Sequence, residues 1–303
     1  LRALQVPSTL QDSLMARLDR LGPAKEVAQL GACIGREFSH ELLAAVAGRP
    51  EPELRAALQQ LLASGLLFRR GRPPHAVYTF KHALVQEAAC RSLLRSRRRV
   101  LHGTIARVLE ERFPDLADST PELLARHFTE AGQAVPAIDY WLKAGRRAAQ
   151  ASANQEAAAH FTKGLALLDD LPDTDARARR ELELQLALGA AVRATEWFTA
   201  ATAKTVYGRA LELAERLWDA SRMVHALRGL WGIAYVAGEW PWARKLADRA
   251  GDTSRRAGDP VAQTVGHLML GVTRFYQGEL NAAQAALETA LGFYDPEDHR
   301  VHV

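Results

Sequence analysis

Residues 78–87 read Tyr-Thr-Phe-Lys-His-Ala-Leu-Val-Gln-Glu, and the chain changes character across this stretch. Its first three residues have the aromatic and β-branched composition of a strand. From residue 83 onward the spacing of apolar residues becomes helical, and we expect Leu84, Ala88 and Leu94 to lie on one side of a long segment. His82 therefore stands at a strand-to-helix junction, where its side chain either packs or caps locally or points across a domain boundary.

The residues before this junction predict a small domain of helices that ends in a β-hairpin. Apolar residues recur at helical spacing in four segments, which begin near residues 8, 24, 39 and 52 and are separated by Gly or Pro breaks. Ser8 or Thr9 can cap the first of these helices. Residues 66–68 and 77–80 then flank a turn that contains Gly and Pro, as in a hairpin. Helices followed by such a hairpin predict a winged-helix domain of the helix-turn-helix class.

The residues after position 120 repeat one design. Gly132, Gly238 and Gly278 are each followed, five residues later, by Ala, and Ser152 begins the same pattern without a Gly. A Gly can end one helix in the left-handed conformation, and a small Ala suits a helix that must approach its neighbour closely. The alanines that we expect at helix–helix contacts are Ala137, Ala157, Ala243 and Ala283.

Together these patterns predict a mainly α protein with three parts. We expect a winged-helix domain over residues 1–81, a basic connecting helix and linker over residues 82–120, and a tetratricopeptide-like α-solenoid over residues 121–303. Within the second part, residues 114–120 are expected to be a short linker. Within the third, residues 176–191 predict one long helix.

The junction also resembles a known family. Residues 80–87, with the leucines at 93 and 94 and the basic run that ends at His102, are similar to bacterial STAND-type regulatory ATPases, and residues 172–189 look like the same family. These are AAA-like proteins with a winged-helix segment and a tetratricopeptide-like array, often fused to class III adenylate/guanylate cyclase or kinase domains. In relatives of that superfamily, a Met-His-Asp motif places its His on the β-phosphate of ADP. The resemblance implies this nucleotide-sensing role for His82, whereas Ala83 replaces the Asp, whose role is not carried over.

The resemblance further implies that the chain is the regulatory or sensor segment of a cytoplasmic signal-transduction ATPase. Its repeats would bind a protein or peptide partner, and its winged helix would contact an ATPase domain that precedes Leu1 and holds ATP or ADP. We expect no cofactor and no catalytic residue in the segment itself. Its sequence contains neither a Gly-x-x-x-x-Gly-Lys-Ser/Thr phosphate loop nor a Gly-x-Gly-x-x-Gly motif.

Two groups of side chains are candidates for binding. Four arginines near residue 97 suit a nucleotide phosphate, an acidic domain face or RNA, although a solvated helix face explains such a charge run equally well. A group of aromatic residues could line a partner groove, with core packing as the other interpretation. The arginines are Arg95, Arg97, Arg98 and Arg99, and the aromatic residues are Trp218, Trp231, Tyr235, Trp240 and Trp242.

Composition limits the other function classes. A net charge of +4 is too small to indicate nucleic-acid binding, and the candidate recognition helix at residues 51–63 is slightly acidic. The wing does carry Arg69, Arg70 and Arg72, so a DNA-binding transcriptional regulator with a repeat effector domain stays open as the alternative. No apolar run approaches the roughly 20 residues of a membrane span, so we expect no membrane partner.

The cysteine and histidine residues show no metal motif. Cys33 and Cys90 lie in apolar helical contexts, and we interpret them as two buried free thiols. The nearest histidine pair, His299 and His302, lies at the end of the sequence and is interpreted as incidental. From spacing alone we therefore expect no metal site.

Overall fold

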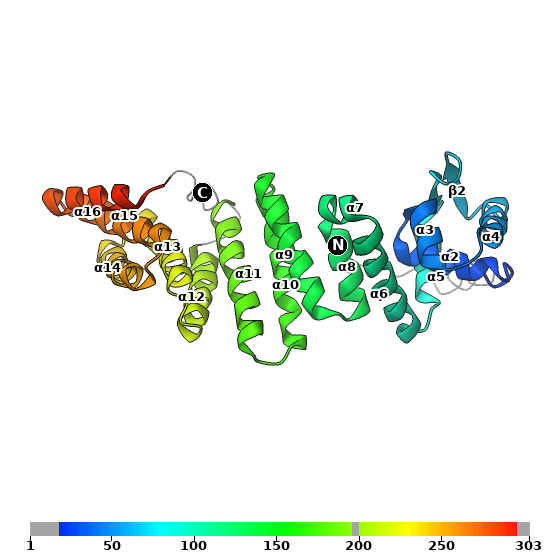
Figure 1. Cartoon of the computed structure of the whole chain (residues 1–303), viewed down its shortest axis with the longest axis horizontal. Helices are drawn as coiled ribbons and strands as arrows, with labels where there is room; N and C mark the ends of the chain where they lie inside the picture. Colours follow the sequence, from blue (N-terminus) through cyan, green and yellow to red (C-terminus); the bar gives the residue numbers. More distant parts are fainter. Residues whose placement is uncertain (1–17, 196–199, 296–303) are drawn as a thin grey trace. The chain divides into compact units, whose positions relative to one another are not determined.

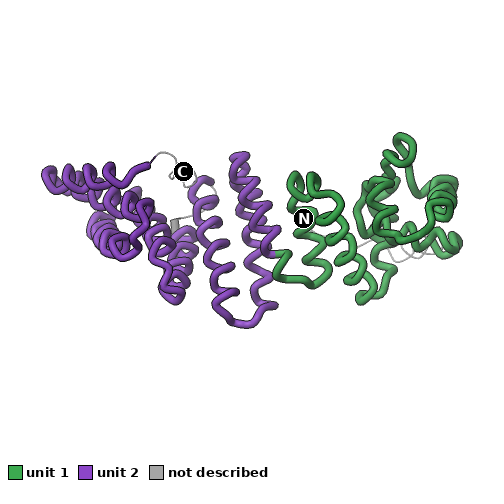
Figure 2. The backbone as a smooth tube through the Cα atoms, viewed as in Figure 1, with its two compact units in different colours: residues 1–137 green, residues 138–303 purple. Residues whose placement is uncertain are grey.

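The computed structural model describes residues 18–195 and 200–295, whose helices and strands are labelled in Figure 1. The predicted caps Ser8 and Thr9, and the pair His299 and His302, lie outside these residues. The chain divides into two compact units, residues 1–137 and residues 138–303 (Figure 2). Both predicted domain boundaries, at residues 81 and 120, fall within the first unit.

The first unit begins with three helices and a small antiparallel sheet. In chain order these elements are α2 (Ala24–Ile34), β1 (Glu37–Ser39), α3 (His40–Ala47), α4 (Glu51–Ala63), β2 (Leu67–Arg70) and β3 (Val77–Phe80). The strand order is β1-β3-β2, and Tyr78 of β3 lies opposite Phe38 of β1 and Arg69 of β2. Three of the expected helices and the hairpin of β2 and β3 are present, and the winged-helix assignment stays a prediction. Strand β1 was not predicted, because three residues are too few to show an alternating pattern.

The remaining helices of the first unit differ from the sequence prediction in two places. They are α5 (Ala83–Arg91), α6 (Arg95–Arg112), α7 (Pro114–Ser119) and α8 (Pro121–Ala131). Leu84 and Leu94 are exposed whereas Ala88 is buried, so the prediction that these three residues lie on one side of a long segment was wrong. The helix ends at Arg91, and α5 instead buries the face that carries Val85 and Ala88. Residues 114–120, predicted as a short linker, instead contain the short helix α7. The helix begins at Pro114, because proline is favourable at the first position of a helix.

The second unit is an array of helices in which each one packs against the next. They are α9 (Ala134–Gln150), which starts in the first unit, α10 (Asn154–Ala166), the 3-10 turn η1 (Leu168–Asp170), α11 (Asp175–Arg193), α12 (Ala200–Arg216), α13 (Ala220–Val236), α14 (Trp240–Ala257), α15 (Pro260–Tyr276) and α16 (Leu280–Phe293). Helix α13 also packs against α11 and α15. The fold is thus mainly α and solenoid-like, as predicted, and α11 is the predicted long helix.

Among the described residues after position 120, five turns share one geometry. In each turn, a residue with φ between 54° and 79° follows the end of a helix. The backbone N–H groups of this residue and of the next one donate to carbonyl oxygens in the last turn of that helix, as in a Schellman motif. At Gly238, for example, the N–H of Gly238 donates to Tyr235 O at 3.1 Å and that of Glu239 to Ala234 O at 2.9 Å. The residues with positive φ are Gly132, Ser152, Trp218, Gly238 and Gly278. The prediction of left-handed glycines is confirmed, and Trp218 is a further case that the sequence pattern missed.

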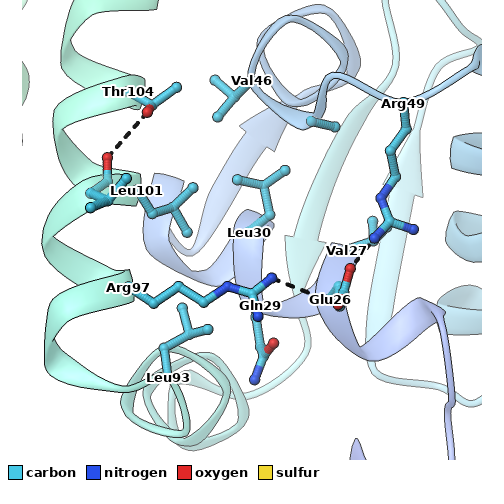
Figure 3. Close-up of a pocket in the computed structure, with 12 residues that line it drawn as sticks. Glu26, Val27, Gln29, Leu30, Val46, Arg49, Leu93, Arg97, Leu101 and Thr104 are labelled. Atoms are coloured by element: carbon cyan, nitrogen blue, oxygen red, sulfur yellow. Dashed lines mark hydrogen bonds and ion pairs between the residues drawn. The ribbon is translucent and has the colours of Figure 1, made fainter.

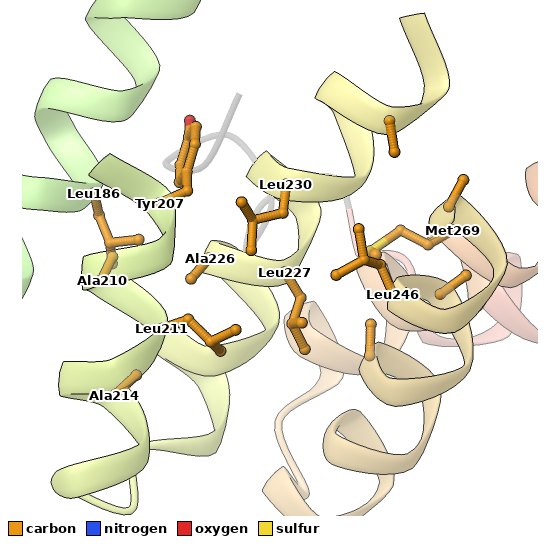
Figure 4. Packing of buried hydrophobic residues seen from close by; sticks show 14 of the residues in the cluster. Leu186, Tyr207, Ala210, Leu211, Ala214, Ala226, Leu227, Leu230, Leu246 and Met269 are labelled. Atoms are coloured by element: carbon orange, nitrogen blue, oxygen red, sulfur yellow. The ribbon is translucent and has the colours of Figure 1, made fainter. Parts of the chain in front are cut away.

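Small residues occupy the contacts between helices of the second unit. Ala157, Ala243 and Ala283 are buried, as expected from their position five residues after each turn. Ala243 belongs to the core shown in Figure 4, which also contains Tyr207 of α12. A Cβ atom built on Gly189 of α11 or Gly229 of α13 would lie within 2.7 Å or 2.4 Å of the Tyr207 ring. The ring therefore packs directly against the backbone of both helices.

We predict that Ala243→Leu and Ala283→Leu each destabilise the second unit. The added atoms have no room at a close helix–helix contact, so each change should lower the free energy of unfolding by about 1–3 kcal/mol. Ala285→Leu is the matched control, because Ala285 is exposed on the same helix as Ala283. Urea denaturation of the three variants measures the effect. Equal unfolding midpoints for all three and the parent would show that these alanines do not set the helix spacing.

Candidate functional site

His82 lies where the sequence placed it, between β3 and α5. It is the residue that precedes the first turn of α5, with φ −128° and ψ 134°, and its side chain makes no capping hydrogen bond to that helix. Its imidazole is exposed, as is the side chain of Ala83. The structure therefore leaves the ring accessible, and the nucleotide-sensing role stays a prediction.

Arg97 lines a hollow of the first unit, although its side chain is 63% exposed. The hollow measures about 280 Å³ and is lined by residues of α2, α3 and α6, together with Arg49 and Leu93 from the turns after α3 and α5 (Figure 3). Arg97 Nη2 lies 3.7 Å from Glu26 Oε1, and Arg49 pairs with the other oxygen of the same carboxylate. Glu26 thus compensates part of the charge that was expected to meet a phosphate.

The other three arginines of the predicted cluster face different surroundings. Arg95 is exposed at the start of α6, whereas Arg98 is half-buried. The guanidinium of Arg99 lies against Gly132, where an added Cβ would approach its Nη2 to 2.4 Å. These contacts direct the arginines to separate places, so the structure does not bring the four side chains together around one ligand.

Part of the predicted aromatic group forms a cluster around a residue that was not predicted. The Trp240 ring stacks on that of Tyr276 at 5.0 Å, and Tyr235 contacts the edges of both. Trp231 lies 5.3 Å from Tyr235. Tyr276 is the last residue of α15, one helix pair after Tyr235. The repeat spacing of about 40 residues could have indicated that these two residues meet.

The two remaining tryptophans lie apart from this cluster. Trp242 has its ring below the Nζ atom of Lys204, at 4.3 Å from the ring centre. Trp218 is 91% exposed at the turn between α12 and α13. The five aromatic residues therefore do not form one group, and a partner groove lined by some of them stays a prediction.

Hydrogen bonds fix the aromatic cluster. Trp231 Nε1 donates to the buried Thr273 Oγ1 at 2.8 Å, and the Tyr235 hydroxyl donates to that of Tyr276 at 2.9 Å. The latter bond raises the pKa of Tyr235. Tyr276 is 54% exposed, so the cluster joins the core on one side and presents an aromatic edge on the other.

A larger groove, which no sequence pattern indicated, lies in the second unit between α9, α11, α13 and α15. It measures about 520 Å³. Its apolar lining includes Leu186 and Ala187 of α11, Val224 of α13, and Val261 and Val265 of α15. Since these residues come from helices about 40 positions apart, only the packing of the helices brings them together.

The charged residues along this groove are mainly basic. The Glu183 carboxylate pairs with Arg146 and Arg222, at 3.3 Å in both cases, and Arg228 is exposed beside them. Asp259, at the start of α15, accepts a hydrogen bond from the Ser221 hydroxyl at 2.8 Å. The Asp219 carboxylate, just outside the lining, also pairs with Arg222 at 2.7 Å, so the charge of Arg222 is balanced and the exposed Arg228 is the positive group beside the apolar lining.

The first unit contains a buried cluster of cysteine and histidine side chains. Cys33 Sγ of α2 lies 3.0 Å from Cys90 Sγ of α5, and a ring nitrogen of His102 of α6 lies within 4.8 Å of both sulfur atoms. His102 Nδ1 is 2.8 Å from Nδ1 of His127, which α8 contributes. The cysteines are free thiols, as predicted, but the sequence did not show that they meet.

The hydrogen bond between the two thiols shifts their pKa values in opposite directions. The hydrogen bond with Cys90, together with burial, raises the pKa of Cys33. The hydrogen bond from Cys33 is also the main cause that lowers the pKa of Cys90 to about 5, with a further contribution from His102. Burial lowers the pKa of His127 to about 3, so its imidazole is neutral near pH 7. The cluster thus favours a thiolate on Cys90.

Within the two described stretches, no helix is both long enough and apolar enough to span a bilayer.

Comparison with known proteins gives limited similarity. No family model matches the chain. An uncharacterized protein of Rhizobium meliloti is 27% identical over 292 residues, which are 95% of this chain but 28% of that protein's length. The chain therefore spans less than a third of this relative.

Two solved structures also show some similarity. One is a Signal Transduction ATPase with Numerous Domains that has a tetratricopeptide repeat sensor, from Pyrococcus horikoshii, with a TM-score of 0.45 and 10% identity over 89% of this chain and 50% of that one. The other is BtubC from P. vanneervenii, with a TM-score of 0.36 and 15% identity over 93% of this chain and 94% of that one. At these scores neither similarity assigns an activity to the chain.

We predict that Thr273→Val loosens the aromatic cluster. The change keeps the shape of the side chain but removes the acceptor of the Trp231 indole N–H, which should cost about 1–3 kcal/mol. Thr289→Val is the control, because the Thr289 hydroxyl is exposed and bonds only within its own helix. Urea denaturation followed by tryptophan fluorescence measures both. If the two valine variants unfold at the same urea concentration, the bond does not hold Trp231.

Proposed function

We propose that the chain is the sensor segment of a larger signal-transduction ATPase, and that its repeats bind a segment of a protein or peptide. The observation that carries the proposal is the groove of about 520 Å³ between α9, α11, α13 and α15. Its size is within the range of ligand pockets, and it combines an apolar lining with a few polar groups. A groove built by successive helix pairs is the usual binding surface of helical repeat proteins.

The chemistry of the groove specifies the kind of segment that it would accept. Valine and leucine side chains favour apolar groups, and their burial contributes about 25 cal/mol per Å². Arg228 and Arg146 would meet a carboxylate, since guanidinium groups bind carboxylates through paired hydrogen bonds. Arg222, by contrast, is already paired with Glu183 and Asp219. We therefore propose a partner segment that has an apolar side chain next to an acidic one.

The first unit would couple this binding to a nucleotide. The resemblance at residues 80–87 supports contact between the winged-helix segment and an adjoining ATPase domain, in which ATP or ADP would bind. The exposed ring of His82 is compatible with a hydrogen bond to the β-phosphate of ADP. In this account the segment itself catalyses no reaction, and its place of action is the cytoplasm. A cyclase or kinase domain in the whole protein is part of the same proposal.

The alternative of a DNA-binding regulator has weaker support. The acidic residue Glu51 at the start of α4 pairs with Arg55 of the same helix and with His40 of α3. Helix α4 is the one that would enter the major groove, and its basic residue Arg55 is thus already paired with a carboxylate. The wing arginines Arg69 and Arg70 are exposed and are the feature that favours DNA. Binding of duplex DNA by the chain, with a steep dependence on salt, would support this alternative.

We predict that Ala190→Trp blocks the groove. Ala190 is exposed but lines the groove, so a bulky side chain there should occupy the groove without overpacking the core. Peptides selected on the chain from a random phage-displayed library should enrich for apolar residues next to Asp or Glu. We expect them to bind the Ala190→Trp variant at least about tenfold more weakly, as measured by fluorescence anisotropy.

Ala285→Trp is the matched control, because it adds the same side chain at an exposed position of α16 that does not line the groove. It should bind the selected peptides as tightly as the parent. If the selection yields no peptide, or if the peptides bind Ala190→Trp unchanged, the groove is not the binding surface.

We predict that His82→Ala weakens ADP retention in a protein that includes the ATPase domain. Loss of a charge-assisted hydrogen bond of about 1.5–3 kcal/mol should raise the dissociation constant of ADP roughly tenfold or more, by the conversion of 1.4 kcal/mol per tenfold. The thermal stability of residues 1–303 should not change, because the imidazole is exposed and does not cap α5. The reverse result, a less stable chain with unchanged ADP affinity, would mean that His82 is structural.

A further inference from the structure

Four helices of the first unit direct cysteine and histidine side chains to one point. Cys33, Cys90 and His102 come from α2, α5 and α6, and each offers a ligand atom within 4.8 Å of the other two. Two of the three side chains are buried, and Cys90 is half-buried. His127 of α8 completes the group through its contact with His102. Neither the winged-helix fold nor the proposed partner binding requires such a cluster.

The donor set is the one that zinc prefers. Thiolate sulfur and imidazole nitrogen are the usual ligands of Zn²⁺, with bonds of about 2.3 Å to sulfur and 2.0–2.1 Å to nitrogen. Around a tetrahedral zinc ion, these lengths place two sulfur atoms about 3.8 Å apart. The sulfur atoms of Cys33 and Cys90 are 3.0 Å apart, much farther than the roughly 2.05 Å of a disulfide bond. A small outward rotation of the two side chains would therefore admit the ion.

The contact between the two histidines orients a ligand. Nδ1 of His102 faces Nδ1 of His127 at 2.8 Å, so one of these atoms must carry the proton that the other accepts. If His102 donates, its Nε2 keeps a lone pair that can ligate a metal. Metal-binding histidines usually donate their second N–H to such a partner, which fixes the ring. His127 is fully buried and is well placed to be that partner.

Charges of both signs lie near this point. Arg98 and Glu130 are the charged groups that act on Cys33 from the surrounding helices, with opposite signs. Arg98 also acts on Cys90, and Arg126 on His127, so the thiolates must supply the charge that balances a cation. On binding Zn²⁺, each of the two cysteine thiols would lose its proton to solvent. The two resulting thiolates carry two negative charges, which balance the charge of the ion.

We propose that Cys33, Cys90 and His102 bind one Zn²⁺ ion, with His127 as a positioning residue. Three protein ligands leave a fourth position for a water molecule or another small ligand. The ion would join α2 of the winged-helix segment to α5 and α6, so it would stabilise the first unit. No sequence motif indicates this site, since its ligands are separated by 57 and 12 residues.

Metal titration of the whole chain tests the proposal. We expect the chain, prepared in reductant, stripped with a chelator and dialysed, to take up one Zn²⁺ per chain. With Co²⁺ as the probe, it should show the near-ultraviolet absorption of thiolate-to-cobalt charge transfer. Cys33→Ser, Cys90→Ser and His102→Gln should each weaken Zn²⁺ binding at least about tenfold. His75→Ala is the control, because this imidazole is exposed and pairs with Glu41, and it should bind as the parent does.

His127 has a separate test. His127→Leu should weaken Zn²⁺ binding by about 10–100-fold, the usual effect of removing such a hydrogen-bond partner, whereas His127→Gln should recover part of the loss. The Co²⁺ spectrum of the unsubstituted chain requires no variant to fold. Absence of the charge-transfer absorption in the reduced chain would overturn the proposal, as would Zn²⁺ uptake that Cys90→Ser leaves unchanged. A Cys33–Cys90 disulfide found by mass spectrometry in chain purified with reductant would also overturn it.

Discussion

The close approach of successive helices is the constraint on which the second unit depends. A left-handed residue ends one helix, two backbone bonds close the turn, and a small residue five positions later lies at the contact with the neighbouring helix. Interiors are packed as densely as organic crystals, so larger residues at these contacts would change the spacing of the helices. Tyr207, held between Gly189 and Gly229, illustrates how little space remains. The groove between α9, α11, α13 and α15 is a consequence of this spacing.

Features that depend on neighbouring residues could be predicted from the sequence. The left-handed glycines, the buried alanines and the strand at residues 77–80 all follow from local backbone preferences. The exposed side chains of Leu84 and Leu94 could not be predicted in this way. Their segment has a helical pattern throughout, but the chain turns between Arg91 and Arg95 and places a different face against α2. Packing across the unit, rather than local preference, decides which face is buried.

The candidate sites depended on contacts between distant residues, and here the sequence predicted less. His82 lies at the expected junction because strand and helix signals are adjacent in the chain. The predicted arginine cluster separates, because consecutive positions of one turn of α6 point about 100° apart: Arg97 toward α2, Arg98 toward the thiols and Arg99 toward Gly132. The groove and the pair Cys33 and Cys90 are formed by helices far apart in the chain, so only the folded arrangement reveals them. The aromatic cluster could be predicted in part. Tyr276 lies 41 residues after Tyr235, which is close to the repeat length, so the spacing of the repeats indicates that the two residues can meet.

The central claim is that the groove of the second unit receives the partner segment. Methyl NMR of the chain, recorded with and without a selected peptide, tests it most directly, because each methyl group reports on its own surroundings. We expect the peptide to shift the signals of Leu186, Val224, Val261 and Val265, which line the groove. The signals of Val85, buried in the first unit, and of Val236, exposed outside the groove, should stay in place. Shifts confined to Val236 or to the first unit would contradict the account.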